Sequence, residues 1–236
     1  PISPLELSSA ASDVYKRQGD SGVLGWGDRL AGGWCERLRL SWMQLPHAPV
    51  VYPLGLRGDG LERVNARWQR EWACRGELRR KVPDGVLLSV GLNDTARVGS
   101  RNGRQQLTPE AFGFGLSQLL DEIRPQTSVM VMGMTPVDEH VMPYADCLWY
   151  ANTDVQALEA EAAEACRCVD VPFLSLHNDM LAEPDWLTWM EPDGIHLNSD
   201  GHSWIERKVS AWPALMAWAG LEQTQTSCLL YTSDAA

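Results

Sequence analysis

The string Val86-Leu87-Leu88-Ser89-Val90-Gly91-Leu92-Asn93-Asp94 joins an almost unbroken apolar run to two polar side chains. A strand with one face in water alternates apolar and polar residues, whereas a continuous apolar run predicts a strand covered on both faces. Such strands are typical of parallel sheets that have helices on either side. Asn93 and Asp94 follow the end of this strand, and parallel sheets bind ligands at that edge.

Similar apolar runs alternate with helical stretches along the rest of the chain. Thr108 is a good N-cap and Pro109 suits the first position of a helix, so one helix is expected to begin there. The further strands are expected at 49–52, 129–132 and 172–176 and the helices at about 28–44, 60–81, 109–124, 154–168 and 200–219. This alternation predicts an α/β fold, doubly wound, with a mainly parallel five-stranded sheet and helices on both faces.

The first strand of this sheet is poorly encoded. It should precede Gly19, where residues 13–18 read DVYKRQ. Only Val14 and Tyr15 suit a buried strand, and Lys16 and Arg17 resist burial on both faces. An element that the fold requires is therefore expected to be missing at this point.

Composition limits the class of protein. The 236 residues suit one domain, and a net charge of −11 argues against nucleic acid or an anionic membrane surface as a partner. No stretch reaches the length of a transmembrane helix, and the spacing of the six cysteines fits neither a metal site nor a disulfide scaffold. Residues 1–18 and 222–236 differ in texture from the centre. We expect a non-native leader and tail flanking a catalytic domain at 19–221, so export is not predicted.

Ser21 lies in a glycine-flanked turn, Gly19-Asp20-Ser21, and is a candidate nucleophile. Serine needs a base to act near neutral pH, and the base needs an orienting partner. The string resembles that of chymotrypsin-like proteases, but those need a histidine upstream, and the first histidine here is His47. The nucleophile elbow of α/β-hydrolases needs glycine two residues after the serine, where Val23 stands. Both of these classes are excluded.

Asp193-Gly194-Ile195-His196 supplies the base and its partner. A carboxylate three residues before an imidazole can hold one ring nitrogen and leave the other free for the serine proton. Taken alone, His196 would be read as a loop residue that caps the following helix. His202 is the rival base; it has no aspartate three residues before it, so we predict a structural or helix-surface role.

Gly58 and Asn93 are candidate donors to an oxyanion. A tetrahedral intermediate needs preorganised donors, which would be the Ser21 amide, the Gly58 amide and the Asn93 side-chain NH₂. Each has a plainer alternative, since Gly58 suits an ordinary turn in Gly58-Asp59-Gly60 and Asn93 suits an Asx turn. The position of Asn93 at the end of an apolar strand favours the site.

The four blocks resemble those of the SGNH, or GDSL, hydrolase family, from about Gly19 to about Leu221. The matching positions are Ser21, Gly58, Asn93 and His196, with Asp193 as the third member of the triad. Gly22 and Val23 depart from the family, which usually has a larger residue and then threonine or serine. The second block lacks the family's polar residue, with Tyr52-Pro53-Leu54 in its place.

The resemblance implies a flavodoxin-like fold and a serine esterase that works through an acyl-serine intermediate, without metal or organic cofactor. Its partner would be a small-molecule ester: a short acyl ester, a lysophospholipid or an acetylated sugar. Two alternatives remain open, an acyltransferase that uses the same site and a non-catalytic flavodoxin-like binding module. The oligomeric state is not predicted.

Most of the eleven tryptophans fall on expected helices and are assigned to packing. Trp26, Trp149, Trp186 and Trp189 fall in loops near the expected site. We predict that Trp26, Trp149 and Trp189 bind the substrate, and that the segment 142–146 forms a pocket wall or lid.

Overall fold

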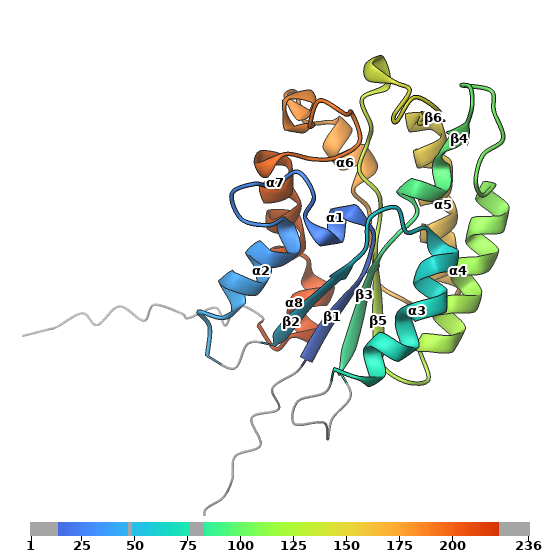
Figure 1. Cartoon of the computed structure of the whole chain (residues 1–236). Coiled ribbons are helices and arrows are strands. Elements are labelled where there is room, and N and C mark those ends of the chain that lie inside the picture. The colour runs from blue at the N-terminus through green and yellow to red at the C-terminus, as the bar shows by residue number, and fades with distance from the viewer. Residues whose placement is uncertain (1–13, 47–48, 76–82, 222–236) are drawn as a thin grey trace, which may run out of the picture.

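The computed structural model describes residues 14–46, 49–75 and 83–221 of the chain (Figure 1). Residues 1–13 of the expected leader and the whole expected tail at 222–236, with Cys228, lie outside the described residues. The helix expected at 60–81 ends earlier, at Ala73, and residues 76–82 lie outside the described residues. No helix in the described ranges is long and apolar enough to cross a membrane.

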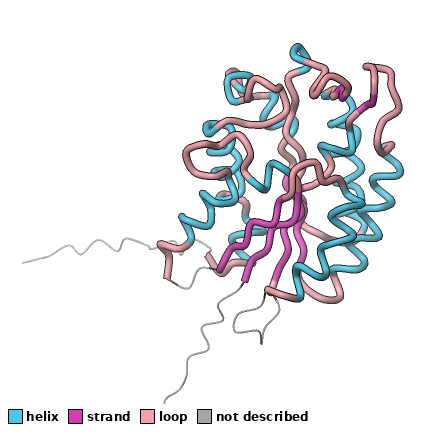
Figure 2. The backbone as a smooth tube through the Cα atoms, in the orientation of Figure 1, coloured by secondary structure: helices cyan, strands magenta, loops and turns pink. Residues whose placement is uncertain are grey.

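A parallel sheet of five strands forms the centre of the fold (Figure 2). Its order is β2-β1-β3-β5-β7, and every neighbouring pair is parallel. The strands are β1 (Val14–Gly19), β2 (Val50–Gly55), β3 (Gly85–Ser89), β5 (Ser128–Met132) and β7 (Phe173–Leu174). A separate antiparallel pair joins β4 (Arg97–Val98) to β6 (Leu148–Trp149). The predicted α/β fold with a mainly parallel sheet is confirmed.

The expectation that the first strand is missing is wrong. The backbone of β1 pairs in parallel with β2 from Val14 opposite Val50 and with β3 from Tyr15 opposite Gly85. A central strand is held by its backbone amide and carbonyl groups, and every residue except proline supplies both groups whatever its side chain. Weak strand propensity in residues 14–18 therefore does not prevent pairing between two strands of strong propensity.

The five expected helices are present in the predicted order, with differences at their ends, and two short helices, Ser21–Leu24 and His177–Leu181, were not predicted. The helices are α1 (Ser21–Leu24), α2 (Trp34–Trp42), α3 (Leu61–Ala73), α4 (Pro109–Ile123), α5 (Asn152–Cys168), α6 (His177–Leu181), α7 (Ser199–Ser210) and α8 (Pro213–Trp218). The helix expected at 28–44 begins only at Trp34, because the Asp28 carboxylate accepts hydrogen bonds from the amides of residues 30, 31 and 33 and holds them in a loop. The helix expected at 200–219 is divided, because Pro213 lacks the amide that would continue α7 and begins α8 instead.

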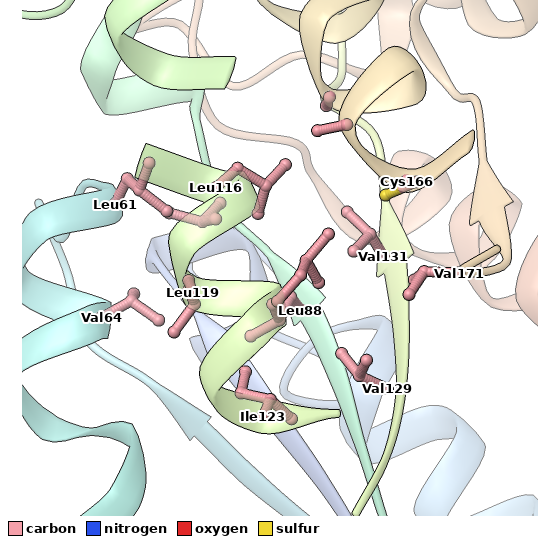
Figure 3. Close-up of a cluster of buried hydrophobic side chains, with 14 of the residues drawn as sticks. Leu61, Val64, Leu88, Leu116, Leu119, Ile123, Val129, Val131, Cys166 and Val171 are labelled. Atoms are coloured by element: carbon pink, nitrogen blue, oxygen red, sulfur yellow. The ribbon is translucent and has the colours of Figure 1, made fainter. Parts of the chain in front are cut away.

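Each face of the sheet is covered by its own hydrophobic cluster. On one face, α3, α4 and α5 pack against β3 and β5, and Figure 3 shows Leu116, Leu119 and Ile123 of α4 beside Leu88 of β3. On the other face, α2, α7 and α8 bury Leu87 and Met130 of the same two strands. Consecutive residues of β3 thus enter opposite cores, which explains the unbroken apolar run.

The site forms where the chain leaves β1 and β3 at the same edge of the sheet. The chain passes from β1 to β2 on one side and from β3 to β5 on the other, and such a switch point opens a crevice at the carboxyl ends of the strands. Helix α1 follows β1 directly, and a 3₁₀ turn, η2 (Leu92–Thr95), follows β3. A Cβ on Gly19 would lie 2.2 Å from the Ser89 carbonyl oxygen, so only glycine lets the two strand ends approach so closely.

Candidate active site

Ser21 is the first residue of α1 and is 8% exposed. Asp20 caps the helix, since its carboxylate accepts a hydrogen bond of 2.8 Å from the Gly22 amide. The turn after β1 is thereby fixed by its own side chain, as expected for an aspartate at an N-cap. The Ser21 hydroxyl is presented at the crevice between β1 and β3.

Ser21, His196 and Asp193 form a continuous chain of hydrogen bonds. His196 Nε2 lies 2.9 Å from Ser21 Oγ, and His196 Nδ1 lies 2.6 Å from Asp193 Oδ2. The other oxygen, Asp193 Oδ1, accepts from the amides of Ile195 and His196 at 3.0 Å each. Donation of the Nδ1 proton to Asp193 leaves Nε2 as the acceptor that faces the serine hydroxyl.

The Asp193 carboxylate is held in its charged form. Partial burial would raise its pKa, but hydrogen bonds from the His196 ring and from the amides of His196 and Ile195 outweigh burial and lower the pKa to about 2. Asp193 is therefore ionised throughout the neutral range. A fixed negative charge at Nδ1 stabilises an imidazolium, which forms when His196 accepts a proton.

His202 is buried, and both nitrogens of its ring make hydrogen bonds within the fold. Its Nδ1 accepts from the Trp34 amide at 3.3 Å, and its Nε2 lies 3.1 Å from the Trp26 carbonyl oxygen, to which it donates. Burial lowers its pKa, so the ring is neutral. The predicted structural role of His202 agrees with these contacts, which tie α7 to the loop after α1.

Gly58 and Asn93 border the same cavity as Ser21 and His196. Gly58 has φ +74, and no atom lies within 4 Å of where its Cβ would be, so the backbone is open to a ligand. The Asn93 side-chain NH₂ donates to the Asp59 carbonyl at 3.1 Å and lies 3.5 Å from Asp20 Oδ2. The first contact orients the amide, while the second is at the outer limit of a hydrogen bond, which leaves one hydrogen for a better acceptor.

Arg67 of α3 holds the Gly58 loop in place. Its guanidinium donates to the Gly19 and Leu54 carbonyls at 2.9 Å each and to the Asp59 carboxylate at 2.7 Å. One side chain thus joins the ends of β1 and β2 to the loop that carries Gly58. The partners of Arg67 lie 8 to 48 residues away in the sequence, so no local pattern predicts this role.

Two buried carboxylates lie behind these donors. Burial raises the pKa of Asp20 to about 6, against the hydrogen bond from the Gly22 amide. Burial also raises the pKa of Asp94 to about 7, against a hydrogen bond from the Leu61 amide at 2.9 Å and with a further contribution from the Asp20 charge. Asp94 Oδ2 caps the first amide of α3, so it is retained for an acceptor rather than for its charge.

Replacing Asp94 by asparagine is expected to stabilise the protein at pH 8. A carboxyl whose pKa is raised in the folded state contributes stability that is complete below the unfolded value of about 3.9 and is lost as pH rises through about 7. Asparagine keeps the acceptor for Leu61 and cannot ionise. The gain in unfolding free energy should be about 2 kcal/mol larger at pH 8 than at pH 5, measured by urea denaturation. Asp121→Asn, at an exposed position, is the control and should change the unfolding free energy by the same small amount at pH 5 and pH 8. An equal gain for Asp94→Asn at the two pH values would contradict the raised pKa of Asp94.

Two cavities meet at Ser21 and His196. The outer cavity, of about 300 Å³, is lined by the candidate residues Ser21, Gly58, Asn93 and His196 and by Arg57, Gln106, Tyr144, Leu148, Tyr150 and Ile195. The inner cavity, of about 40 Å³, extends from Ser21 and His196 to residues at the carboxyl ends of β3 and β5. The candidate residues of all four sequence blocks therefore border one space.

The three candidate substrate-binding tryptophans are placed differently. The Trp26 ring lies 6.2 Å from that of His196 and is covered by the Arg57 guanidinium at 3.5 Å, so it borders the site. Trp149 lines a neighbouring hollow with Arg101, next to Tyr150. Trp189 packs against Trp204 at 6.0 Å and belongs to the core on the α7 side, so the structure does not bring it to Ser21.

The segment 142–146 contributes Tyr144 to the outer cavity, with its ring 6.1 Å from that of His196. Trp26 and Tyr144 thus flank the imidazole from different parts of the chain. Within the ranges described, no group of three or more His, Cys, Asp or Glu side chains is placed to hold a metal ion.

Comparison with protein families gives one match, which spans residues 18–204. The matching model is that of the GDSL-like lipase/acylhydrolase family. The chain belongs to this family. It is an enzyme of the ester-hydrolysing GDSL type, and the resemblance seen in the four sequence blocks is confirmed. A search of curated proteins gives no significant match.

Solved structures of a lipase/acylhydrolase and of two esterases share the fold. The lipase/acylhydrolase from Enterococcus faecalis is 20% identical, with a TM-score of 0.66 over 84% of this chain and 93% of that one. The acetylxylan esterase Axe2 from Geobacillus stearothermophilus is 16% identical, with a TM-score of 0.61 over 89% and 95%. The esterase EstA from Pseudoalteromonas sp. is 16% identical, with a TM-score of 0.57 over 84% and 94%. At these identities the likeness concerns the fold.

Proposed function

We propose that this GDSL enzyme is a serine esterase that hydrolyses carboxylic esters through an acyl-serine intermediate, with Ser21 as nucleophile. The observation that carries the proposal is the hydrogen-bonded chain from Ser21 Oγ to His196 at 2.9 Å and from His196 to Asp193 at 2.6 Å. A nucleophile, a base and an orienting carboxylate in contact are the signature of activated serine. A non-catalytic binding module would be favoured if Ser21 and His196 were out of reach of each other, and they are 2.9 Å apart.

His196 moves the proton in both halves of the reaction. Nε2 takes the proton from Ser21 as Oγ bonds to the ester carbonyl carbon, and returns it to the alcohol oxygen as the C–O bond breaks. Nε2 then takes a proton from water, whose oxygen attacks the acyl-serine, and returns it to Ser21 Oγ as the acid leaves. Asp193 stays ionised and stabilises the imidazolium in each half.

The negative oxygen of each tetrahedral intermediate is assigned to the Ser21 amide, the Gly58 amide and the Asn93 NH₂. All three residues border the outer cavity. The Ser21 amide is in the first turn of α1, where amides have no partner within the helix. This cavity is large enough to admit water beside the acyl-serine, which favours hydrolysis over transfer of the acyl group to another alcohol.

The proposed substrates are small esters: short acyl esters, lysophospholipids or acetylated sugars. The acetylxylan esterase among the structural neighbours acts, by its name, on an acetylated polysaccharide. The test is labelling with a fluorophosphonate probe together with hydrolysis of p-nitrophenyl acetate and butyrate. Labelling at Ser21 and turnover are expected; a folded protein that neither labels nor hydrolyses either ester would refute the serine esterase proposal.

Asn93→Ala is expected to lower kcat by about 10²- to 10³-fold with little change in KM, because an oxyanion donor acts mainly in the transition state. The measurement is steady-state hydrolysis of p-nitrophenyl butyrate. Asn102→Ala, in an exposed turn, is the matched control and should retain wild-type kcat. A fall in kcat of less than about threefold for Asn93→Ala would remove Asn93 from the oxyanion assignment.

A further inference from the structure

We propose that the inner cavity binds the acyl group of the substrate and limits it to about four carbons. This inference rests on the proposed function, because an acyl group enters the site only as part of an ester. The inner cavity begins at Ser21 and His196 and extends below them to Met132 of β5 and Ile205 of α7.

The three groups on the ester carbonyl carbon point in different directions, so each can be assigned to a part of the site. The carbonyl oxygen must face Gly58 and Asn93, which border the outer cavity. The alcohol oxygen must face His196 Nε2, which protonates it, and the alcohol then extends into the larger space beside Arg57 and Gln106. The acyl tail takes the remaining direction, toward the cavity that carries neither Gly58 nor Asn93.

The wall of the inner cavity suits a saturated tail. Met132, Leu176 and Ile205 are each 3% exposed or less and present apolar side chains to it. Two of its polar side chains are hydrogen-bonded within the protein, since Asp20 accepts from the Gly22 amide and both ring nitrogens of His202 are bonded. Ser89 and Thr135 also line it. An alkyl group that enters therefore displaces no hydrogen bond of Asp20 or His202 and contacts mostly apolar side chains.

The size of the inner cavity sets the length of the tail. A water-sized group needs roughly 10–15 Å³ of such volume, so about 40 Å³ holds roughly three groups the size of a methylene. Three carbons beyond the carbonyl carbon make a butyryl group. Gly22 also lines this cavity and places no side chain in it.

The test is the chain-length profile of the whole protein on p-nitrophenyl acetate, butyrate, hexanoate and octanoate. We expect kcat/KM for acetate and butyrate to agree within about tenfold, and kcat/KM for octanoate to be at least about 100-fold below that for butyrate, since each misfitting methylene can cost about tenfold or more. Octanoate turnover equal to butyrate turnover overturns the proposal while leaving the serine esterase proposal intact. Absence of any turnover and of fluorophosphonate labelling refutes both.

A matched pair of variants on β5 tests whether the wall of the inner cavity limits the length of the acyl chain. Met132→Ala enlarges the inner cavity and is expected to raise the octanoate-to-butyrate ratio of kcat/KM about tenfold. Met130→Ala lies two residues earlier on β5, in the same buried cluster, and does not line the inner cavity. It should leave that ratio within about twofold of wild type. Equal ratios in the two variants would overturn the assignment, and because each ratio is internal to one variant, it does not depend on loss of stability.

Discussion

Ser21→Ala is expected to lower kcat for p-nitrophenyl butyrate by about 10⁵- to 10⁶-fold and to abolish fluorophosphonate labelling. Alanine removes the only atom that bonds to the acyl group, and it keeps the backbone amide that we assign to the oxyanion. Oγ is hydrogen-bonded to His196 Nε2, so its loss costs one hydrogen bond at an 8% exposed position. The thermal midpoint should therefore change little, as circular dichroism can verify.

Ser100→Ala is the control, because Ser100 is exposed in a turn away from the crevice and should retain both labelling and wild-type kcat. If Ser21→Ala keeps more than about one hundredth of the activity, another residue is the nucleophile. Labelling that persists in this variant would identify that residue by peptide mapping.

His196→Ala is expected to lower kcat by about as much as Ser21→Ala, on the order of 10⁵-fold or more. Without Nε2 no group at 2.9 Å can take the Ser21 proton, and the Asp193 charge has no imidazolium to stabilise. Because the two residues act as a unit, the double variant should be no less active than either single one. Steady-state hydrolysis of p-nitrophenyl butyrate at high enzyme concentration measures all three.

His140→Ala is the matched control, since His140 is also paired with an aspartate, Asp138 at 2.9 Å, but its side chain is 87% exposed. It should retain wild-type kcat. Additive losses in the Ser21/His196 double variant would show that the two residues do not work together, and an active His196→Ala would reopen the case for another base.

Much of the fold was readable from local patterns. The apolar run at 86–90 predicts a strand buried on both faces, and β3 has alternate residues in two cores. Thr108 and Pro109 predict the start of α4. The start of α2 and the end of α7 were predicted wrongly although their signals are local, since Asp28 binds amides two to five residues later and Pro213 lacks the amide that would continue α7. β1 was not readable at all, since its pairing depends on the backbones of β2 and β3.

The contacts of the site likewise divide into those that the sequence predicted and those that it did not. Asp193 and His196 are three residues apart, so their contact is local and the spacing alone predicts it. Asp20 and Arg67 were missed as supports. Asp20 stands next to Ser21 in the quoted string and could have been recognised as an N-cap, whereas the partners of Arg67 lie on other elements.

The sequence by itself determined the chemistry available to this protein: a serine in a capped turn, a local aspartate–histidine pair, and Gly58 and Asn93 after strands. Only the tertiary structure decided which histidine meets the serine. His196 and Ser21 are 175 residues apart and lie 2.9 Å from each other, while His202, six residues further on, is buried between Trp34 and Trp26. The physical reason is the separation, along the sequence, of the residues that make contact. Residues a few positions apart can make contact within one turn, so their spacing predicts the contact. Contacts between distant segments, and the cavities that these segments enclose, depend on how β1, β3 and α7 pack together in the whole fold.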